Sequence, residues 1–344
     1  MILFQCDYNE GAHPKVMERL VETNMEQTPG YGEDCYCQSA AEKIRKACGN
    51  ELLDVHFLVG GTQTNMTVIA AALRPYQGVV CAETGHINVH ETGAVESCGH
   101  KVLTMPGKDG KITAKQVEEA WLSHANNDSF EHMVQPGMVY ISNPTELGTI
   151  YSKAELTAIS EACHKYGLYL FLDGARLGYG LTAKDNDLTL KDIAALCDVF
   201  YIGGTKVGAL FGEAVVISNE TLKKDFRYMI KQKGGMLAKG RLLGVQFDTL
   251  FTDDLYLKIS EHAIEMADML RAAFEQKGYS YYVKCNTNQI FVIVPDEDLQ
   301  KLSENFGYCY DHQYDEKRSV VRFCTSWATK EENVKALIKT LESL

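Results

Sequence analysis

Apolar and polar positions follow two periods along the first 210 residues. Apolar residues three or four positions apart predict amphipathic helices over 14–27, 64–75 and 152–167. Short, nearly continuous apolar runs that end in glycine or polar residues predict strands over 54–61, 78–84, 137–144, 169–178 and 198–206. Because such runs suit strands buried on both faces, their alternation with helices predicts an α/β fold with a parallel sheet between helices.

The pattern changes after about residue 246. A long amphipathic helix over 255–278 precedes two strand-like runs, "NQIFVIVP" and "SVVRFCTSW", and a closing helix in "TKEENVKALIKTLESL". These segments predict a small C-terminal α+β domain. We therefore divide the chain into an N-terminal arm (1–15), a large domain (16–246) and a small domain (247–344). No linker rich in Pro or Ser separates them, so we expect tight packing.

The composition is typical of a globular protein and argues against a nucleic-acid or membrane role. Of the 344 residues, 45% are hydrophobic and 23% are charged, and the formal net charge is −12. Binding to a phosphate backbone requires clustered Lys and Arg instead. No apolar run reaches the roughly 18 residues of a membrane span, and the N-terminus lacks the features of a signal peptide. The eleven scattered cysteines favour reduced thiols in a cytoplasmic protein over a disulfide scaffold.

The candidate chemistry lies where the predicted strands end. Gly60-Gly61-Thr62 follows one strand, Asp173 ends another and Lys206 follows a third. Ligands of parallel sheets bind beyond the carboxyl ends of the strands. We therefore expect these three segments to meet at one site.

Pyridoxal phosphate would explain this combination of residues. A desolvated lysine loses proton affinity and becomes a nucleophile toward carbonyls, so Lys206 would bind the cofactor aldehyde covalently. Asp173 would pair with the pyridine nitrogen. Backbone N–H groups after the glycines, with Thr62 or Thr64 as helix cap, would hold the phosphate. The structural alternative is an ion-paired lysine together with an Asp173–Arg176 salt bridge.

Nine stretches along almost the whole chain resemble the threonine aldolase family, the low-specificity L-threonine aldolase-like β-eliminating lyases among the fold-type-I pyridoxal-phosphate enzymes. They are "CDYNEGAHPKVMERL", "GYGED", "GGTQTN", "GHINVHETGA", "TELGTIYS", "LDGARL", "GGTKVG", "GEAVV" and "VRFCTSWAT". "TELGTIY", "DGAR" and "GGTK" are highly specific in combination. The resemblance implies a large domain with a mostly parallel seven-stranded sheet and a small C-terminal α+β domain.

The resemblance also implies roles at the matching positions. The positions that match cofactor-binding residues are Gly61, Thr62, Gln63, His86, Asp173 and Lys206. Among these, Lys206 and His86 are the catalytic candidates, and His86 matches a histidine stacked on the cofactor ring. The positions that match substrate-binding residues are Cys6, Arg176 and Arg322. The two arginines would hold the α-carboxylate, a contact that suits the planar guanidinium.

Two further implications concern assembly and departures from the family pattern. In the family, the neighbouring subunit completes the site, which implies a homodimer or homotetramer; the candidates here are Tyr31, Lys231, Lys239 and Arg241. Family members commonly carry Ser or Asn at the position of Cys6, and a thiol is a poorer donor than a hydroxyl. His86 and His90 have helical metal-ligand spacing, but no third ligand accompanies them, so we expect no zinc.

The expected activity is the cleavage of L-threonine, L-allo-threonine or a related β-hydroxy-α-amino acid to glycine and an aldehyde. His86, His90, Glu91 or a water molecule would accept the hydroxyl proton. Two alternatives are left by the residues: another pyridoxal-phosphate reaction, such as β-elimination or racemisation, and a nicotinamide-dependent oxidoreductase. The second ranks low because no G-x-G-x-x-G follows the first strand.

Overall fold

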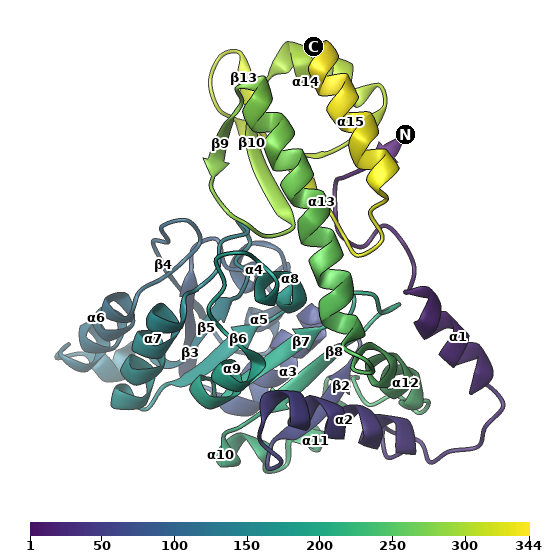
Figure 1. Ribbon diagram of the computed structural model, residues 1–344. Helices are drawn as coiled ribbons and strands as arrows, with labels where there is room; N and C mark the ends of the chain where they lie inside the picture. The colour runs from purple at the N-terminus through teal and green to yellow at the C-terminus, as the bar shows by residue number, and fades with distance from the viewer.

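A seven-stranded sheet forms the centre of the computed structural model, which describes residues 1–344 (Figure 1). Its strands, in spatial order, are β2 (Asp54–Leu58), β8 (Glu213–Ile217), β7 (Val199–Gly203), β6 (Tyr169–Asp173), β5 (Gln135–Ser142), β3 (Gln77–Ala82) and β4 (Val102–Met105). Only β8 runs antiparallel to its neighbours. The mostly parallel seven-stranded sheet expected from the sequence is therefore confirmed.

Helices cover both faces of this sheet, which is why its strands are apolar on both sides. One face packs against α3 (Gly61–Ala72), α5 (Ala94–Ser97) and α11 (Phe226–Gln232). The other face packs against α2 (Cys35–Cys48), α6 (Ala114–Ala125), α7 (Lys153–Tyr166), α9 (Leu190–Leu196) and α12 (Arg241–Leu250). All five residues of β7 and all five of β8 are buried.

The ends of two predicted elements follow directly from local chemistry. Helix α7 begins after Ser152, whose hydroxyl accepts from the backbone N–H of Glu155, while the Glu155 carboxylate accepts from the N–H of Ser152. Gly167, with φ of 66°, ends it. The helix predicted over 152–167 is thus confirmed, and its boundaries were readable because a reciprocal cap and a left-handed glycine are local signals.

Several predicted boundaries were wrong: the helix predicted over 14–27 ends at Glu22, and two further errors lie beside the strand-end residues. Helix α3 begins at Gly61 with Gly60 as its cap, so Thr62 and Thr64 lie within the helix and cap nothing. The strand predicted over 169–178 ends at Asp173, and a short helix, α8 (Leu177–Leu181), follows. Only glycine fits at position 174 of this turn, because a Cβ there would lie 1.9 Å from the carbonyl oxygen of Tyr201. Apolar content alone did not distinguish the turn from a longer strand.

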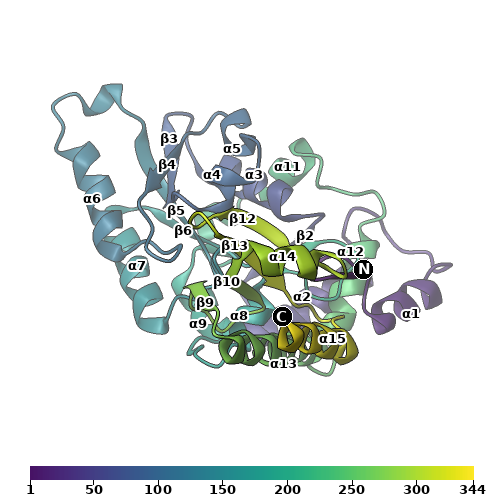
Figure 2. The same cartoon turned by 90° about the horizontal axis from the view of Figure 1, so that it is seen from above.

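The small domain is an antiparallel sheet covered by helices (Figure 2). Its strand order is β12 (Cys309–Gln313), β13 (Arg318–Cys324), β10 (Gln289–Pro295) and β9 (Ser280–Val283). Helices α13 (Leu255–Lys277), α14 (Asp296–Ser303) and α15 (Glu331–Ser343) complete it. Helix α13 runs from the large sheet to the small one (Figure 1). Near its start, the Tyr256 hydroxyl donates to the Gly203 carbonyl at 2.9 Å, so one helix contacts both the site-bearing strand β7 and the small-domain core.

The first residues of the chain connect the two domains. Strand β1 (Ile2–Leu3) pairs with β11 (Phe306–Gly307), and Phe4 is buried in the small-domain core. The chain then crosses to the large domain, where α1 (Pro14–Glu22) packs against α12. The short elements α4 (His86–Val89), α10 (Glu220–Lys223) and η1 (Phe130–His132) complete the fold. No helix of the chain has both the length and the apolar character needed to cross a membrane.

Candidate active site

A cavity of about 330 Å³ lies at the carboxyl ends of the parallel strands. It brings together Gly60, Gly61 and Thr62 after β2, Asp173 at the end of β6, and Lys206 after β7. Further lining residues are Tyr8, His86, Ser142, Glu146, Arg176, Tyr201, Thr205 and Glu213. The three strand-end segments singled out in the sequence therefore share one cavity.

Lys206 presents a free amine to this cavity. Its Nζ atom has no hydrogen-bond or ion-pair partner, and the nearest aromatic ring, that of Tyr8, is centred 6.0 Å away. Burial lowers the pKa of Lys206, and the Arg176 guanidinium lowers it further, while Asp7, Asp173 and Glu213 act in the opposite direction. A half-buried lysine with a lowered pKa and no partner is suited to attack a carbonyl.

Asp173 is fixed by three donors at the floor of the cavity. Its Oδ1 atom accepts from the backbone N–H of Ala175 at 3.0 Å. Its Oδ2 atom accepts from the Tyr140 hydroxyl at 2.5 Å and from the Asn65 amide at 3.3 Å. These donors compensate the burial of a carboxylate that is only 4% exposed. A carboxylate held in this way is suited to pair with a protonated ring nitrogen.

The N-terminus of α3 faces the same cavity with unused donors. The backbone N–H groups of Gly61, Thr62 and Gln63 make no hydrogen bond within the chain, because the first bond of the helix comes from Thr64. A Cβ at position 61 would lie 3.1 Å from the Tyr201 hydroxyl, so a larger residue there would press on the Tyr201 side chain. The Gln63 side chain points elsewhere and donates to the Lys233 carbonyl at 3.2 Å. The backbone N–H groups of this turn are therefore free to bind an anion, and so is the Thr62 hydroxyl, which lines the cavity and makes no hydrogen bond.

Arg176 pairs with the N-terminal arm rather than with Asp173. Its Nε atom donates to Asp7 Oδ2 at 2.6 Å and its Nη2 atom donates to Asp7 Oδ1 at 3.1 Å. Burial alone would raise the pKa of Asp7, but Arg176 and Lys206 lower it to about 2. The Asp173–Arg176 pair considered above is thus wrong. The Nη1 group of Arg176 makes no hydrogen bond and is available to a substrate.

Arg322 and Cys6 lie beyond the lining of the cavity. Arg322, on β13, donates from Nη1 to the Gln289 side chain at 3.1 Å and from Nη2 to the Gln5 carbonyl at 3.2 Å. Its Nε atom is buried without a partner. The Cys6 thiol donates to the Asn9 side chain at 2.9 Å. A buried guanidinium nitrogen without a partner is costly unless a ligand binds it.

His86 is oriented by two carboxylates. Its Nδ1 atom lies 2.9 Å from Glu91 Oε1, and its backbone N–H donates to Glu146 Oε1 at 2.9 Å. With Nδ1 hydrogen-bonded to a carboxylate, Nε2 is the nitrogen left to accept a proton. The His90 ring lies 5.5 Å from that of His86 and is exposed. Burial of part of its ring and the neighbouring cationic groups lower the pKa of His90.

Sequence reasoning assigned no role to two buried glutamates of the cavity. Glu213 accepts from the backbone N–H of Gly204 at 3.1 Å and from the Thr205 hydroxyl at 2.9 Å, and burial raises its pKa to about 8. Glu146 also accepts from the Ser142 hydroxyl at 2.6 Å, and burial raises its pKa. Both lie in stretches that carry the family resemblance, "GEAVV" and "TELGTIY". The sequence did contain a signal for Glu213: it is the one charged residue at the start of an otherwise apolar strand, which indicates a buried carboxyl group.

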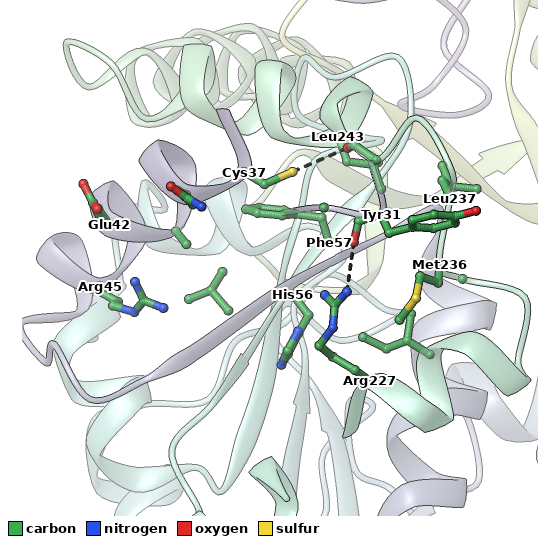
Figure 3. Close-up of a pocket in the computed structure, with 17 residues that line it drawn as sticks. Tyr31, Cys37, Glu42, Arg45, His56, Phe57, Arg227, Met236, Leu237 and Leu243 are labelled. Atoms are coloured by element: carbon green, nitrogen blue, oxygen red, sulfur yellow. Dashed lines mark hydrogen bonds between the residues drawn. The ribbon is translucent and has the colours of Figure 1, made fainter. Parts of the chain in front are cut away.

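The candidates for a neighbouring subunit lie away from Lys206, around a second cavity of about 260 Å³ (Figure 3). Tyr31 lines that cavity, has a positive φ of 61° and is half exposed, and Arg227 donates to its carbonyl at 3.2 Å. Lys231 lies 5.1 Å from the centre of the Tyr31 ring. Lys239 is exposed, whereas Arg241 donates to the carbonyls of Thr23 and Glu26 in its own chain.

Known proteins resemble this chain along most of its length. The family model described as beta-eliminating lyase matches residues 6–297. A low specificity L-threonine aldolase of Pseudomonas aeruginosa is 30% identical over 344 residues, which are 98% of this chain and 96% of that protein. The solved structure of a threonine aldolase of Leishmania major has 44% identity and a TM-score of 0.97, and the match covers 100% of this chain and 99% of that one.

The architecture is shared more widely than the sequence. An aspartate aminotransferase structure of Thermus thermophilus superposes with a TM-score of 0.74 at only 14% identity, covering 100% of this chain and 91% of that one. A putative L-allo-threonine aldolase of Listeria monocytogenes superposes with a TM-score of 0.76 at 19% identity, covering 99% and 96%. These matches confirm the expected fold class.

Proposed function

Since the chain belongs to the β-eliminating lyase family, we propose that it is a pyridoxal-phosphate-dependent aldolase that cleaves L-threonine, L-allo-threonine or a related β-hydroxy-α-amino acid to glycine and an aldehyde. The observation that carries this proposal is the unpartnered Nζ of Lys206 in one cavity with Asp173 and the open N-terminus of α3. An amine, a buried carboxylate and a cluster of free N–H groups correspond to the aldehyde, the ring nitrogen and the phosphate of this cofactor.

The residues of the cavity fit the cofactor group by group. Lys206 would bind the aldehyde carbon, Asp173 the ring nitrogen, and the N–H groups of Gly61, Thr62 and Gln63 the phosphate. The His86 ring would cover one face of the pyridine. When bound, pyridoxal phosphate supplies an electron sink for the electron pair of the cleaved Cα–Cβ bond.

The remaining chemistry belongs to the side chains of this chain. The free Nη1 of Arg176 and the free Nε of Arg322 would hold the α-carboxylate of the substrate and thereby fix which bond at Cα is cleaved. Nε2 of His86, oriented by Glu91, would accept the proton of the β-hydroxyl group. The lowered pKa of Lys206 favours the neutral amine, which is the form that would attack the aldehyde of the cofactor.

The decisive experiment follows the cofactor and the products together. The purified protein should show visible absorption that borohydride removes, and mass spectrometry should then find the reduced cofactor on Lys206. L-Threonine should yield glycine and acetaldehyde in equal amounts, whereas β-elimination would yield a keto acid and ammonia, and racemisation would yield a D-amino acid. Labelling of a different lysine, or the absence of glycine, would refute the assignment.

We also propose that two copies share their sites. The support is the exposed, left-handed Tyr31 and the exposed Lys231 and Lys239, which have no role in the cavity of their own chain. Two-fold symmetry would place each set at the partner's cavity. A cytoplasmic location would suit the eleven free cysteines, since thiols stay reduced there.

A further inference from the structure

A continuous path of hydrogen bonds joins the two functional halves of the cavity. It runs from His86 Nδ1 to Glu91 Oε1 at 2.9 Å, from Glu91 Oε1 to the side-chain amide of Asn65 at 2.8 Å, and from that amide to Asp173 Oδ2 at 3.3 Å. Asn65 is fully buried, and Glu91 and Asp173 are 6% and 4% exposed. The path therefore lies inside the protein, where water does not take the place of a missing partner.

Only Asn65 can connect the two carboxylates. Its NH₂ group has two hydrogens, one for Glu91 and one for Asp173, and it carries no charge of its own. Glu91 has no other donor than His86 and Asn65, and its second oxygen is buried without a partner. Asp173 has further donors in Tyr140 and Ala175. Loss of the Asn65 amide would thus leave Glu91 with one hydrogen-bond donor, whereas Asp173 would keep two.

The position of Asn65 on α3 gives this contact a defined geometry. The first turn of that helix offers the free N–H groups to the cavity, and Asn65 follows one turn after Gly61. A rigid helix thereby fixes the anion-binding end and the amide with respect to each other. The side chain of Asn65 approaches the cavity from behind Asp173 and Glu91 and is not part of its lining.

From this geometry we infer that Asn65 is a positioning residue that couples the hydrogen bonding of Asp173 at the cofactor ring nitrogen to the orientation of His86 through Glu91. The inference rests on the proposed function, because it assigns Asp173 and His86 their roles toward the cofactor and the substrate. Asn65 touches neither of them. Its effect passes through the two carboxylates, so it should be visible in cofactor binding as well as in turnover.

The first test compares variants at Asn65 with a control on the same helix. Asn65→Ala removes the bridge, and Asn65→Asp keeps the shape but places a third carboxyl group between two others. The control is Thr67→Ala, because Thr67 is also fully buried and donates to the Gln63 carbonyl. Each protein is freed of cofactor and titrated with pyridoxal phosphate, and the dissociation constant is read from the visible absorption.

Asn65→Ala should weaken cofactor binding about 10- to 150-fold, the range for a hydrogen bond to a charged group, and shift the absorption maximum. Asn65→Asp should weaken it more than Asn65→Ala, although it preserves the volume. Thr67→Ala should lower the melting temperature but leave the dissociation constant and the spectrum unchanged. If Asn65→Asp binds the cofactor as tightly as the unmodified protein, or Asn65→Ala behaves like Thr67→Ala, the inference is wrong.

The second test measures the coupling itself in a double-mutant cycle. Glu91→Gln should change the dissociation constant of the cofactor and the kcat for L-threonine in the unmodified background. In the Asn65→Ala background the same substitution should have a much smaller effect on the dissociation constant, because the path to Asp173 is already broken, whereas its effect on kcat through His86 should remain. Additive effects on the dissociation constant would overturn the coupling. The proposed function has its own test, since the unmodified protein would then still carry the cofactor on Lys206 and form glycine.

Discussion

At the scale of a residue, the buried Nε atom of Arg322 leads to a prediction about substrate binding. Its two terminal nitrogens are satisfied by Gln289 and Gln5, but its Nε is buried without a partner. If that nitrogen holds the substrate carboxylate, Arg322→Ala should lower kcat/KM for L-threonine roughly 10- to 150-fold, the equivalent of about 1.5–3 kcal/mol for a charge-assisted contact. The absorption of the bound cofactor should stay nearly unchanged.

A control for this prediction lies on the same strand. Arg318 is exposed and paired with Asp315, so Arg318→Ala should leave kcat/KM unchanged. Arg322→Lys should restore only part of the activity, because an ammonium cannot keep the contacts to Gln289 and Gln5 and also present a donor in the place of Nε. Unaltered kcat/KM in Arg322→Ala, measured on L-threonine and its stereoisomers, would remove the carboxylate assignment.

The two histidines of α4 and its C-terminus should differ sharply in their contribution to turnover. His86→Asn should lower kcat about 10²- to 10⁴-fold, the usual loss for a general base, because Glu91 holds its Nδ1 and leaves Nε2 to accept the proton. His90→Asn should cost less, since the His90 ring is exposed and does not line the cavity. Steady-state kinetics on the two single variants separate these outcomes, and the reverse order would make His90 the base.

At the scale of an element, the turn between β7 and β8 depends on a carboxyl group that burial keeps protonated. Glu213 opens β8 and accepts from Gly204 and Thr205 at the end of β7. Burial raises its pKa from 4.5 to about 8. Between these values the folded chain holds a proton that the unfolded chain releases, so Glu213 makes the free energy of unfolding decrease as the pH rises from about 5 to 8.

Glu213→Gln should remove this dependence, because the amide resembles the protonated carboxyl group, with one oxygen to accept from Gly204 and an NH₂ group that can donate to the Thr205 hydroxyl, but cannot ionise. In thermal unfolding, the variant should gain melting temperature relative to the unmodified protein from pH 5 to 8, and the difference should then level off. A difference that is constant over the whole range would show that Glu213 does not titrate across it.

The ends of individual helices and strands differ in how well the sequence predicts them. Helix α7 was predictable because Ser152, Glu155 and Gly167 are caps that act within one turn. Helix α3 begins with glycines and has no side-chain cap, so its start could only be misplaced. The strand ends at Asp173, next to the close approach of Gly174 to the Tyr201 carbonyl, and this contact with the neighbouring strand β7 has no local signal in the sequence.

At the scale of the whole molecule, only some residues of the site could be predicted from the sequence. They are the residues that lie at the carboxyl ends of the predicted parallel strands, where ligands bind, or that are close to one another in sequence. Lys206, Asp173 and Gly61 lie at or just after such strand ends. The pairing of Arg176 with Asp7 could not be predicted, because Asp7 lies 169 positions away in the chain. The Asn65–Asp173 contact spans 108 positions. Pairings of this kind require the tertiary structure, since no periodicity records them.

The shared site is also a prediction about the whole assembly. Lys206→Ala and Tyr31→Ala should each be nearly inactive alone, because one removes the cofactor amine and the other a residue that we place at the partner's cavity. When the two chains are co-expressed, about half of the dimers are mixed, and each mixed dimer has one intact site, so activity should return to about a quarter.

The control for co-expression pairs Lys206→Ala with His86→Ala. Both residues line the cavity of one chain, so mixed dimers of these variants would have two damaged sites and should recover nothing. Equal recovery in both mixtures, measured by glycine release, would contradict the shared site.

The N-terminal arm implies an order of events during synthesis. Asp7 leaves the ribosome among the first residues, yet its partner Asn288 lies 281 positions later, and the Phe4 carbonyl accepts from the still later Cys324. The first residues of the arm must therefore wait while nearly the whole chain is made, because the β-strand partner of Ile2–Leu3 near residue 306 is also missing; only the Arg176 partner of Asp7 is made earlier. Contacts of such long range form late and slowly. Nascent chains that already contain the entire large domain should consequently still lack Arg322 and the settled contacts of the arm that surround the substrate side of the site.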